Sequence, residues 1–96
     1  MPSFESIKNI LHQHKERLSL QYGLNFLAVF GSYARNQQTS ESDVDILVEF
    51  NKPTGMEFID LAEELEKILS TKVDLVSKRG LKEDQFKAIE KELRYV

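Results

Sequence analysis

Three aspartates stand out in this sequence because each one interrupts an otherwise apolar run. Asp43 and Asp45 lie two residues apart at the start of the run 43–50, and Asp74 lies inside the run 72–77. Successive side chains of a β-strand point to opposite faces, so Asp43 and Asp45 should share one face and leave the other to apolar residues. Two neighbouring carboxylates repel each other unless a cation lies between them, and their oxygens suit Mg²⁺ or Mn²⁺. We therefore predict a metal site at Asp43 and Asp45, which Asp74 could complete.

A second polar motif precedes these aspartates. Gly31 and Ser32 end the apolar run 24–30, and Arg35 follows three residues later. Gly31 has no Cβ, so a phosphate can approach its backbone closely. Ser32 offers a hydroxyl at an expected helix start, where free N–H groups attract anions, and the planar guanidinium of Arg35 can brace a phosphate by a forked contact. We predict that these three residues hold a nucleoside triphosphate.

Each motif taken alone has a simpler explanation. An Asp-x-Asp pair recurs by chance on protein surfaces, a Gly-Ser pair often forms an ordinary strand-to-helix turn, and Asp74 equally fits an exposed acid on an edge strand. The combination is more specific, because phosphoryl or nucleotidyl transfer needs neutralised phosphate charge together with in-line positioning. We therefore expect the two motifs to meet at neighbouring strand ends.

The spacing of apolar residues predicts the elements that carry these motifs. Helical periodicity marks the longer helices, and short apolar runs bounded by turn residues mark the strands. The expected elements are a helix from a Ser3 cap to about Tyr22 and ended by Gly23, a strand 24–30, a short helix from a Ser32 cap to about Gln37, a strand 43–50, a helix from Met56 to Leu69, a strand 72–77 and a helix from Leu81 to about Leu93. This order predicts an α/β fold in which helices flank a small sheet of about three core strands.

Composition narrows the class of protein. The chain has 96 residues, 41% of them hydrophobic and 30% charged, which is typical of one globular domain spanning 1–96. The net charge of −3 disfavours direct binding to a nucleic-acid backbone. We find no cysteine, no secretory leader and no apolar run long enough for a membrane span, so we expect a cytoplasmic protein without a membrane partner. So small a core should also leave apolar surface for a partner.

The two motifs together resemble the signature of the minimal nucleotidyltransferases, which belong to the DNA polymerase beta-like superfamily. The likeness covers nearly the whole chain from Leu24 onward. The matching segments are Gly31-Ser32-Tyr33-Ala34-Arg35, Ser42-Asp43-Val44-Asp45-Ile46-Leu47-Val48, Lys72-Val73-Asp74-Leu75-Val76 and the tail Leu93-Arg94-Tyr95-Val96. The resemblance implies the polymerase beta-like fold, a mixed sheet with flanking helices.

The resemblance also implies an activity, the metal-dependent transfer of AMP from ATP to an acceptor hydroxyl. By motif match, Asp43, Asp45 and Asp74 would be the catalytic residues and would hold two ions of Mg²⁺ or Mn²⁺. Asp74 would lie near the catalytic metal and assist deprotonation of the acceptor. The triphosphate would be held as predicted above, with the arginine as a weaker match.

Small stand-alone members of this family resemble the antitoxin half of bacterial and archaeal toxin–antitoxin pairs. The resemblance implies a hetero-oligomer with a HEPN-domain ribonuclease toxin, which the antitoxin silences by transferring AMP to a tyrosine. Two alternatives stay open: neutralisation by binding without catalysis, and transfer to RNA or to a small molecule. The acidic balance of the chain argues against transfer to RNA.

One residue departs from the family pattern. Members usually carry glycine after the arginine, whereas this chain has Asn36. Asparagine tolerates left-handed backbone angles better than most residues, so we expect the turn to survive. Polymerases and tRNA-tailing enzymes carry extra domains that hold their acceptor. We recognise none here and expect a partner to bring the acceptor.

Overall fold

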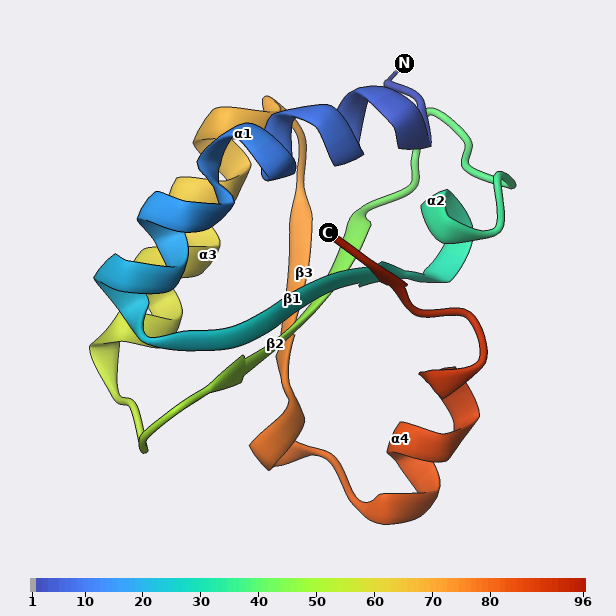
Figure 1. The fold of residues 1–96 in the computed structure, drawn as a ribbon. Helices are drawn as coiled ribbons and strands as arrows, with labels where there is room; N and C mark the ends of the chain where they lie inside the picture. Colours follow the sequence, from blue (N-terminus) through green and yellow to red (C-terminus); the bar gives the residue numbers. More distant parts are fainter. Residues whose placement is uncertain (1) are drawn as a thin grey trace.

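A computed structural model describes residues 2–96 of the chain. Its helices and strands alternate as the sequence predicts, with a short strand added at the end (Figure 1). The elements are α1 (Phe4–Tyr22), β1 (Leu24–Phe30), α2 (Gly31–Ala34), β2 (Val44–Phe50), α3 (Met56–Leu69), β3 (Val73–Ser77), the 3₁₀ helix η1 (Lys78–Gly80), α4 (Glu83–Glu90) and β4 (Arg94–Tyr95).

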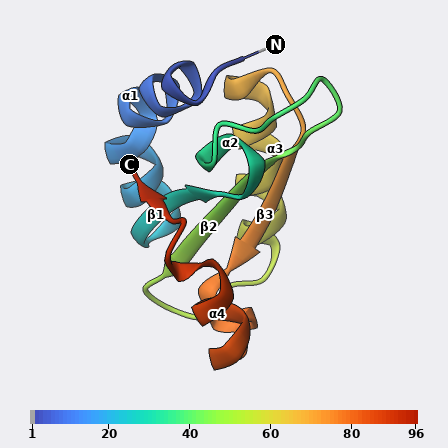
Figure 2. The same ribbon diagram turned by 90° about the vertical axis from the view of Figure 1, so that its right-hand side faces the viewer.

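The strands form one mixed sheet in the order β3-β2-β1-β4. Strand β1 runs antiparallel to both β2 and β4, whereas β2 and β3 are parallel. Helix α1 lies on one side of this sheet and α4 on the other, as the two perpendicular views agree (Figures 1 and 2). The predicted α/β class, with a small mixed sheet flanked by helices, is confirmed.

The hydrophobic core lies between the sheet and the helices α1 and α3. Alternate residues of β2 supply its centre, because Val44, Ile46 and Val48 are all completely buried. The helices contribute apolar residues at helical spacing, namely Ile7, Leu11, Leu18, Leu61, Leu65 and Leu69. The predicted inward face of β2 is therefore the face that packs.

Both ends of α1 follow their sequence signals. The Ser3 hydroxyl accepts a hydrogen bond from the Ser6 N–H, and the Ser3 N–H donates to the Ser6 hydroxyl. At the other end Gly23 adopts a left-handed conformation (φ 69°) and its N–H donates to the Ser19 carbonyl. The predicted cap and the predicted stop are both confirmed.

The C-terminal region differs from the prediction. The last helix spans Glu83–Glu90 rather than 81–93, because the Gln85 side chain accepts the Lys82 N–H and starts the helix later. Beyond the helix, Tyr95 pairs with Ala28 of β1 and the Val96 N–H donates to the Leu27 carbonyl. Pairing with the open edge of β1 therefore replaces the predicted last helical turn and adds a fourth strand to the three predicted.

Helix α4 is attached to the sheet by aromatic rings and one lysine. The Lys78 ammonium lies 4.9 Å from the ring centre of Phe86 in α4 and 6.0 Å from that of Phe26 in β1. It also pairs with Glu49 at 3.6 Å. The Lys78–Phe86 contact is small, and α4 has no fully buried residue. The helix is therefore the most loosely packed of the described elements.

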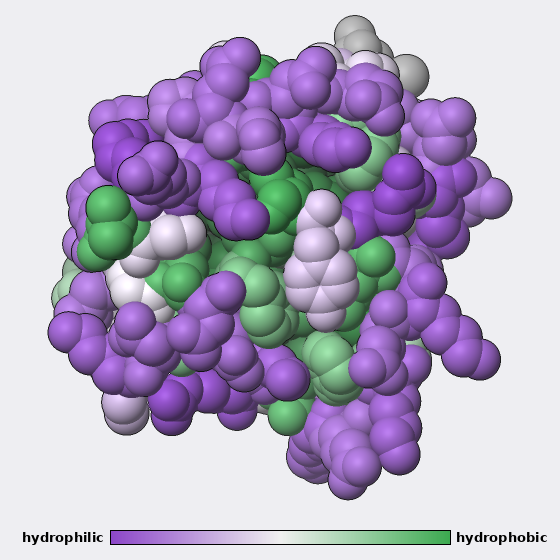
Figure 3. Space-filling view, viewed as in Figure 1, coloured by the Kyte–Doolittle hydropathy of each residue, from purple (hydrophilic) through white to green (hydrophobic). Residues whose placement is uncertain are grey.

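Apolar surface remains uncovered on this small domain. Leu20 of α1 is 80% exposed, Met56 and Ile59 at the start of α3 are 65% and 48% exposed, and Tyr95 is 57% exposed. Figure 3 also shows apolar side chains gathered at the centre of one face, framed by hydrophilic ones. A contiguous exposed apolar patch, unlike a single exposed side chain, is typical of a surface that binds another protein.

Candidate functional site

The predicted acids lie at one end of β2 and β3. Asp45 and Asp74 are direct neighbours in the parallel pairing of these strands, and Asp43 immediately precedes β2. Asp45 is half-buried, whereas Asp43 and Asp74 are exposed. The structure therefore brings Asp45 and Asp74 together as predicted and places Asp43 at the solvent side of the pair.

The position of Asp45 makes its ionisation unfavourable. Partial burial, the charge of Asp74, a hydrogen bond to the Asp74 carboxyl and the charge of Asp43 raise the pKa of Asp45 from 3.8 to about 6. Arg35 opposes this increase, but its effect is smaller. Raised acid pKa values of this kind result when carboxylates are held together without an intervening cation. The site thus has excess negative charge that a cation would relieve.

Gly31 joins the two predicted motifs directly. Its φ of 74° lies in the left-handed region, and a Cβ on this residue would lie 1.9 Å from Oδ2 of Asp45. Phe30, the preceding residue, pairs with Asp45 across β1 and β2. Glycine is therefore required here by both backbone conformation and space, and the predicted meeting of the Gly-Ser turn with the acids is confirmed for Gly31 and Asp45.

The short helix after Gly31 is smaller than predicted. It spans Gly31–Ala34, its N-cap is Phe30, and Ser32 lies inside its first turn instead of capping it. The burial of Tyr33 and Ala34 against the core holds the turn in place. The predicted serine cap is therefore wrong, because the helix starts one residue earlier, at the left-handed Gly31.

The turn that follows this helix is completed by Asn36. Its φ is 58°, in the left-handed region that asparagine tolerates. The Asn36 N–H donates to the Tyr33 carbonyl and the Gln37 N–H to the Ser32 carbonyl. Our expectation that asparagine can replace the usual glycine at this position is confirmed for the backbone.

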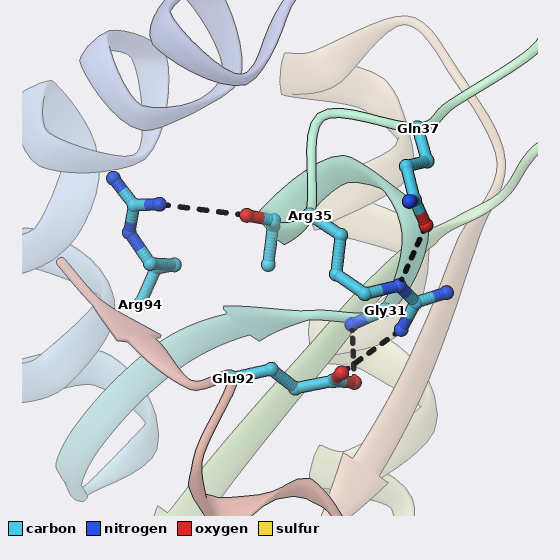
Figure 4. Close-up of polar contacts among 6 residues, drawn as sticks. Gly31, Arg35, Gln37, Glu92 and Arg94 are labelled. Atoms are coloured by element: carbon cyan, nitrogen blue, oxygen red, sulfur yellow. Dashed lines mark hydrogen bonds and ion pairs between the residues drawn. The ribbon is translucent and has the colours of Figure 1, made fainter.

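Arg35 lies at the edge of the Gly31 turn, where an acidic residue from the C-terminal segment meets it (Figure 4). Nη1 of Arg35 pairs with Oε2 of Glu92 at 2.9 Å, and the Gly31 N–H donates to Oε1 of the same carboxylate at 3.0 Å. Nε of Arg35 donates to Gln37 Oε1 at 3.1 Å. Glu92 was not predicted as a site residue, because the sequence places it in the last turn of an expected helix spanning 81–93.

These residues fit a divalent cation by their chemistry. Carboxylate oxygens from two neighbouring strands, one of them held next to a like charge, are the donors that Mg²⁺ and Mn²⁺ prefer. Within residues 2–96, however, no three histidine, cysteine or acidic side chains are already close enough to form a metal centre. Phosphate oxygens and water would have to complete the coordination of the ion. The roles of the individual acids stay predictions.

A mixed sheet with neighbouring acids beside a Gly-Ser turn supplies the groups that enzymes of phosphoryl and nucleotidyl transfer need. The sequence profile of the nucleotidyltransferase domain family matches residues 10–96. This chain belongs to that family and is a nucleotidyltransferase.

Similar proteins extend this assignment. A candidate protein adenylyltransferase of Methanocaldococcus jannaschii is 47% identical over 100 residues, covering 100% of both chains. The protein adenylyltransferase MntA of Thermococcus cleftensis is 43% identical over 97 residues, covering 100% of this chain and 98% of that protein.

Solved structures are similar as well. A candidate minimal nucleotidyltransferase is 28% identical, with a TM-score of 0.86 over 99% of this chain and 97% of its own. A toxin–antitoxin structure containing AMP-PNP is 25% identical, with a TM-score of 0.68 over 86% of this chain and 69% of that one. None of the helices within residues 2–96 has the length and apolar character needed to cross a bilayer.

Proposed function

We propose that this nucleotidyltransferase is an antitoxin that transfers AMP from ATP to a tyrosine hydroxyl of a cognate HEPN ribonuclease toxin and thereby silences it. The observation that carries the proposal is the contact between the two motifs. Gly31 lies so close to Asp45 that no Cβ fits between them, and Asp74 adjoins Asp45 on the next strand. A phosphate chain held at the turn would therefore lie beside the carboxylates.

In this proposal Asp43, Asp45 and Asp74 hold two Mg²⁺ or Mn²⁺ ions, which neutralise the charge of the triphosphate and of the leaving pyrophosphate. The tyrosine oxygen attacks the α-phosphorus of ATP, and the bond from that phosphorus to the pyrophosphate oxygen breaks. Asp74, the exposed member of the adjacent pair, accepts the tyrosine proton. AMP-tyrosine and pyrophosphate are the products.

Gly31, Ser32 and Arg35 hold the triphosphate in this proposal. Ser32 lies half-buried in the first turn of α2, where its hydroxyl would bind a phosphate oxygen. The Arg35 guanidinium lies at the edge of the same turn and presents further N–H donors. The AMP-PNP reported for the similar toxin–antitoxin structure supports ATP as the nucleotide.

Four observations support a protein as the acceptor. Similar chains carry the name protein adenylyltransferase, and a similar structure is a toxin–antitoxin assembly. The exposed apolar residues of α1 and α3 supply surface that a partner can cover. The net charge of −3 disfavours a nucleic-acid acceptor.

The decisive experiment is transfer of label from α-³²P-ATP in the presence of Mg²⁺ to the small protein encoded by the adjacent gene. The wild-type chain should label that protein, and an Asp43→Asn, Asp45→Asn double variant should lower the rate about 1,000-fold or more, a loss of about 4 kcal/mol in the transition state. A matched Asp60→Asn, Asp84→Asn variant removes the same charge from exposed helical positions and should label normally. Equal labelling by both double variants would refute the assignment of the acids.

A second candidate is neutralisation by masking, with catalysis idle. The exposed apolar residues Leu20, Met56 and Ile59 favour it, since a partner that covers them would be held without any transfer. Growth of cells that express the toxin distinguishes the two proposals. Full protection by the Asp43→Asn, Asp45→Asn variant would favour masking, and loss of protection would favour transfer.

A further inference from the structure

The anion-binding groups of the Gly31 turn are already in contact with an acid of the same chain. Glu92 lies in the connection between α4 and β4, 61 residues beyond Gly31, and its side chain is 26% exposed. One carboxylate oxygen accepts the Gly31 N–H at 3.0 Å and the other pairs with Arg35 Nη1 at 2.9 Å (Figure 4). The carboxylate thus contacts two of the three groups proposed to hold the triphosphate.

A carboxylate and a phosphate make the same demands on these donors. Both are anions that present two oxygens to a guanidinium and a backbone N–H. The Arg35–Glu92 contact uses a donor that a phosphate would need, and the charge of Glu92 would repel the phosphate oxygens. A triphosphate at the turn would therefore be opposed by Glu92 both sterically and electrostatically.

We propose that Glu92 is a tethered competitor of the triphosphate, so that nucleotide binds only after this carboxylate has left Gly31 and Arg35. The inference rests on the proposed function, because it requires the Gly31 turn to be the phosphate site. Release needs only the side chain to move, since β4 anchors the backbone just beyond Glu92 by pairing with β1. The apparent affinity for nucleotide is then lowered by the fraction of molecules in which Glu92 is bound.

The test is nucleotide affinity, measured by calorimetry with ATP in the presence of Mg²⁺. Glu92→Gln keeps an oxygen that can accept the Gly31 N–H and removes the charge, so the turn should stay folded. It should bind ATP about three- to tenfold more tightly than wild type. Glu92→Ala should show the same direction of change. Glu90→Gln removes an equal charge from an exposed position in α4 and should change affinity less than about twofold.

Binding of inorganic tripolyphosphate and of adenosine shows whether Glu92 competes with the phosphates or with the nucleoside of ATP. The gain in Glu92→Gln should appear with tripolyphosphate, because the carboxylate competes with phosphate oxygens. It should be missing with adenosine, which carries none. A gain of equal size with adenosine would overturn the proposal, since the effect would then lie in the shape of the site and not in its phosphate donors.

Two outcomes separate this inference from the proposed function. Wild type that binds ATP while Glu92→Gln binds it equally or more weakly would overturn the inference, because Glu92 would then merely stabilise the turn. The proposed nucleotide site would survive that result. A failure of wild type and of both Glu92 variants to bind ATP and tripolyphosphate would overturn the proposed site, and the competition with it.

Discussion

The two faces of β2 have opposite energetic roles. On one face Val44, Ile46 and Val48 are completely buried under α1 and α3. On the other face Asp45 lies half-buried beside Asp74, with its pKa raised to about 6 by burial and by neighbouring acids. The first face stabilises the fold through apolar burial alone, whereas the second combines the buried Leu47 with the electrostatic repulsion around Asp45. Period-two alternation therefore lets a single short strand supply both the core and a site where carboxylates repel each other.

Truncation on the buried face should have the largest effect on stability. Ile46→Ala removes apolar atoms from a completely buried position and should lower the free energy of unfolding by about 3 kcal/mol. Ile46→Val should lower it by about 1 kcal/mol. Urea denaturation monitored by circular dichroism measures both. A loss below about 1 kcal/mol for Ile46→Ala would contradict the central place of this residue in the core.

The junction between the two faces should be nearly as sensitive. Gly31→Ala would place a Cβ 1.9 Å from Oδ2 of Asp45 at a left-handed φ, and should lower the free energy of unfolding by about 2 kcal/mol. Gly80→Ala is the matched control, because a Cβ there meets nothing within 4 Å. The two variants are compared by urea denaturation. Equal stability of both would disprove the close approach of Gly31 and Asp45.

Removing the charge of Asp45 should have the smallest effect on the free energy of unfolding, and it should raise this quantity instead of lowering it. Asp45→Asn should raise the free energy of unfolding at pH 7 by about 1 kcal/mol without metal, a figure reduced from the full pKa shift because the residue is only half-buried and solvent screens its charge. Asp60→Asn, on the exposed side of α3, should change it by less than about 0.5 kcal/mol. Thermal denaturation in EDTA compares the two variants with wild type.

Ionisation of Asp45 should also destabilise wild type as the pH rises. Folded Asp45 keeps its proton to about pH 6, whereas the unfolded chain loses it near 3.8. Between these values the folded state binds more protons, so wild type should lose stability from Asp45 as pH rises from about 4 to 6 and lose no more above that. Asp45→Asn should lack this component. A difference between the two proteins that stays constant from pH 4 to 7 would contradict it.

Features that depend on local sequence patterns could be predicted from the sequence alone. Strand β1 begins and ends at the predicted residues, α1 has its predicted cap and stop, and Asn36 adopts the left-handed angle expected of it. The meeting of Gly31 with Asp45 was also predictable, because Gly31 follows the end of one apolar run and Asp45 lies near the start of the next. Periodicity and turn chemistry determine all of these features.

The features that the sequence analysis missed depend on distant contacts. Strand β4 has only two residues and exists because the edge of β1 is open, and no local pattern announces so short a strand. Glu92 is one acid in a charged tail, and its role arises from a hydrogen bond to a residue 61 positions away. The start of α2 was misplaced because Ser32 looks like a cap, while the left-handed Gly31 starts the turn earlier.

If the acidic face of β2 gives up stability in order to bind a cation and nucleotide, as we propose, these ligands should stabilise wild type but not Asp45→Asn. The most direct test is the melting temperature of wild type and Asp45→Asn, each measured in EDTA and then with Mg²⁺ and ATP. Asp45→Asn should melt about 4–8 °C above wild type in EDTA, and wild type alone should rise with ligand, by about 2.7 kcal/mol at a hundredfold excess over Kd, so that the order reverses. The proposal would be contradicted if Asp45→Asn melted below wild type in EDTA, or if Mg²⁺ and ATP raised its melting temperature as much as that of wild type.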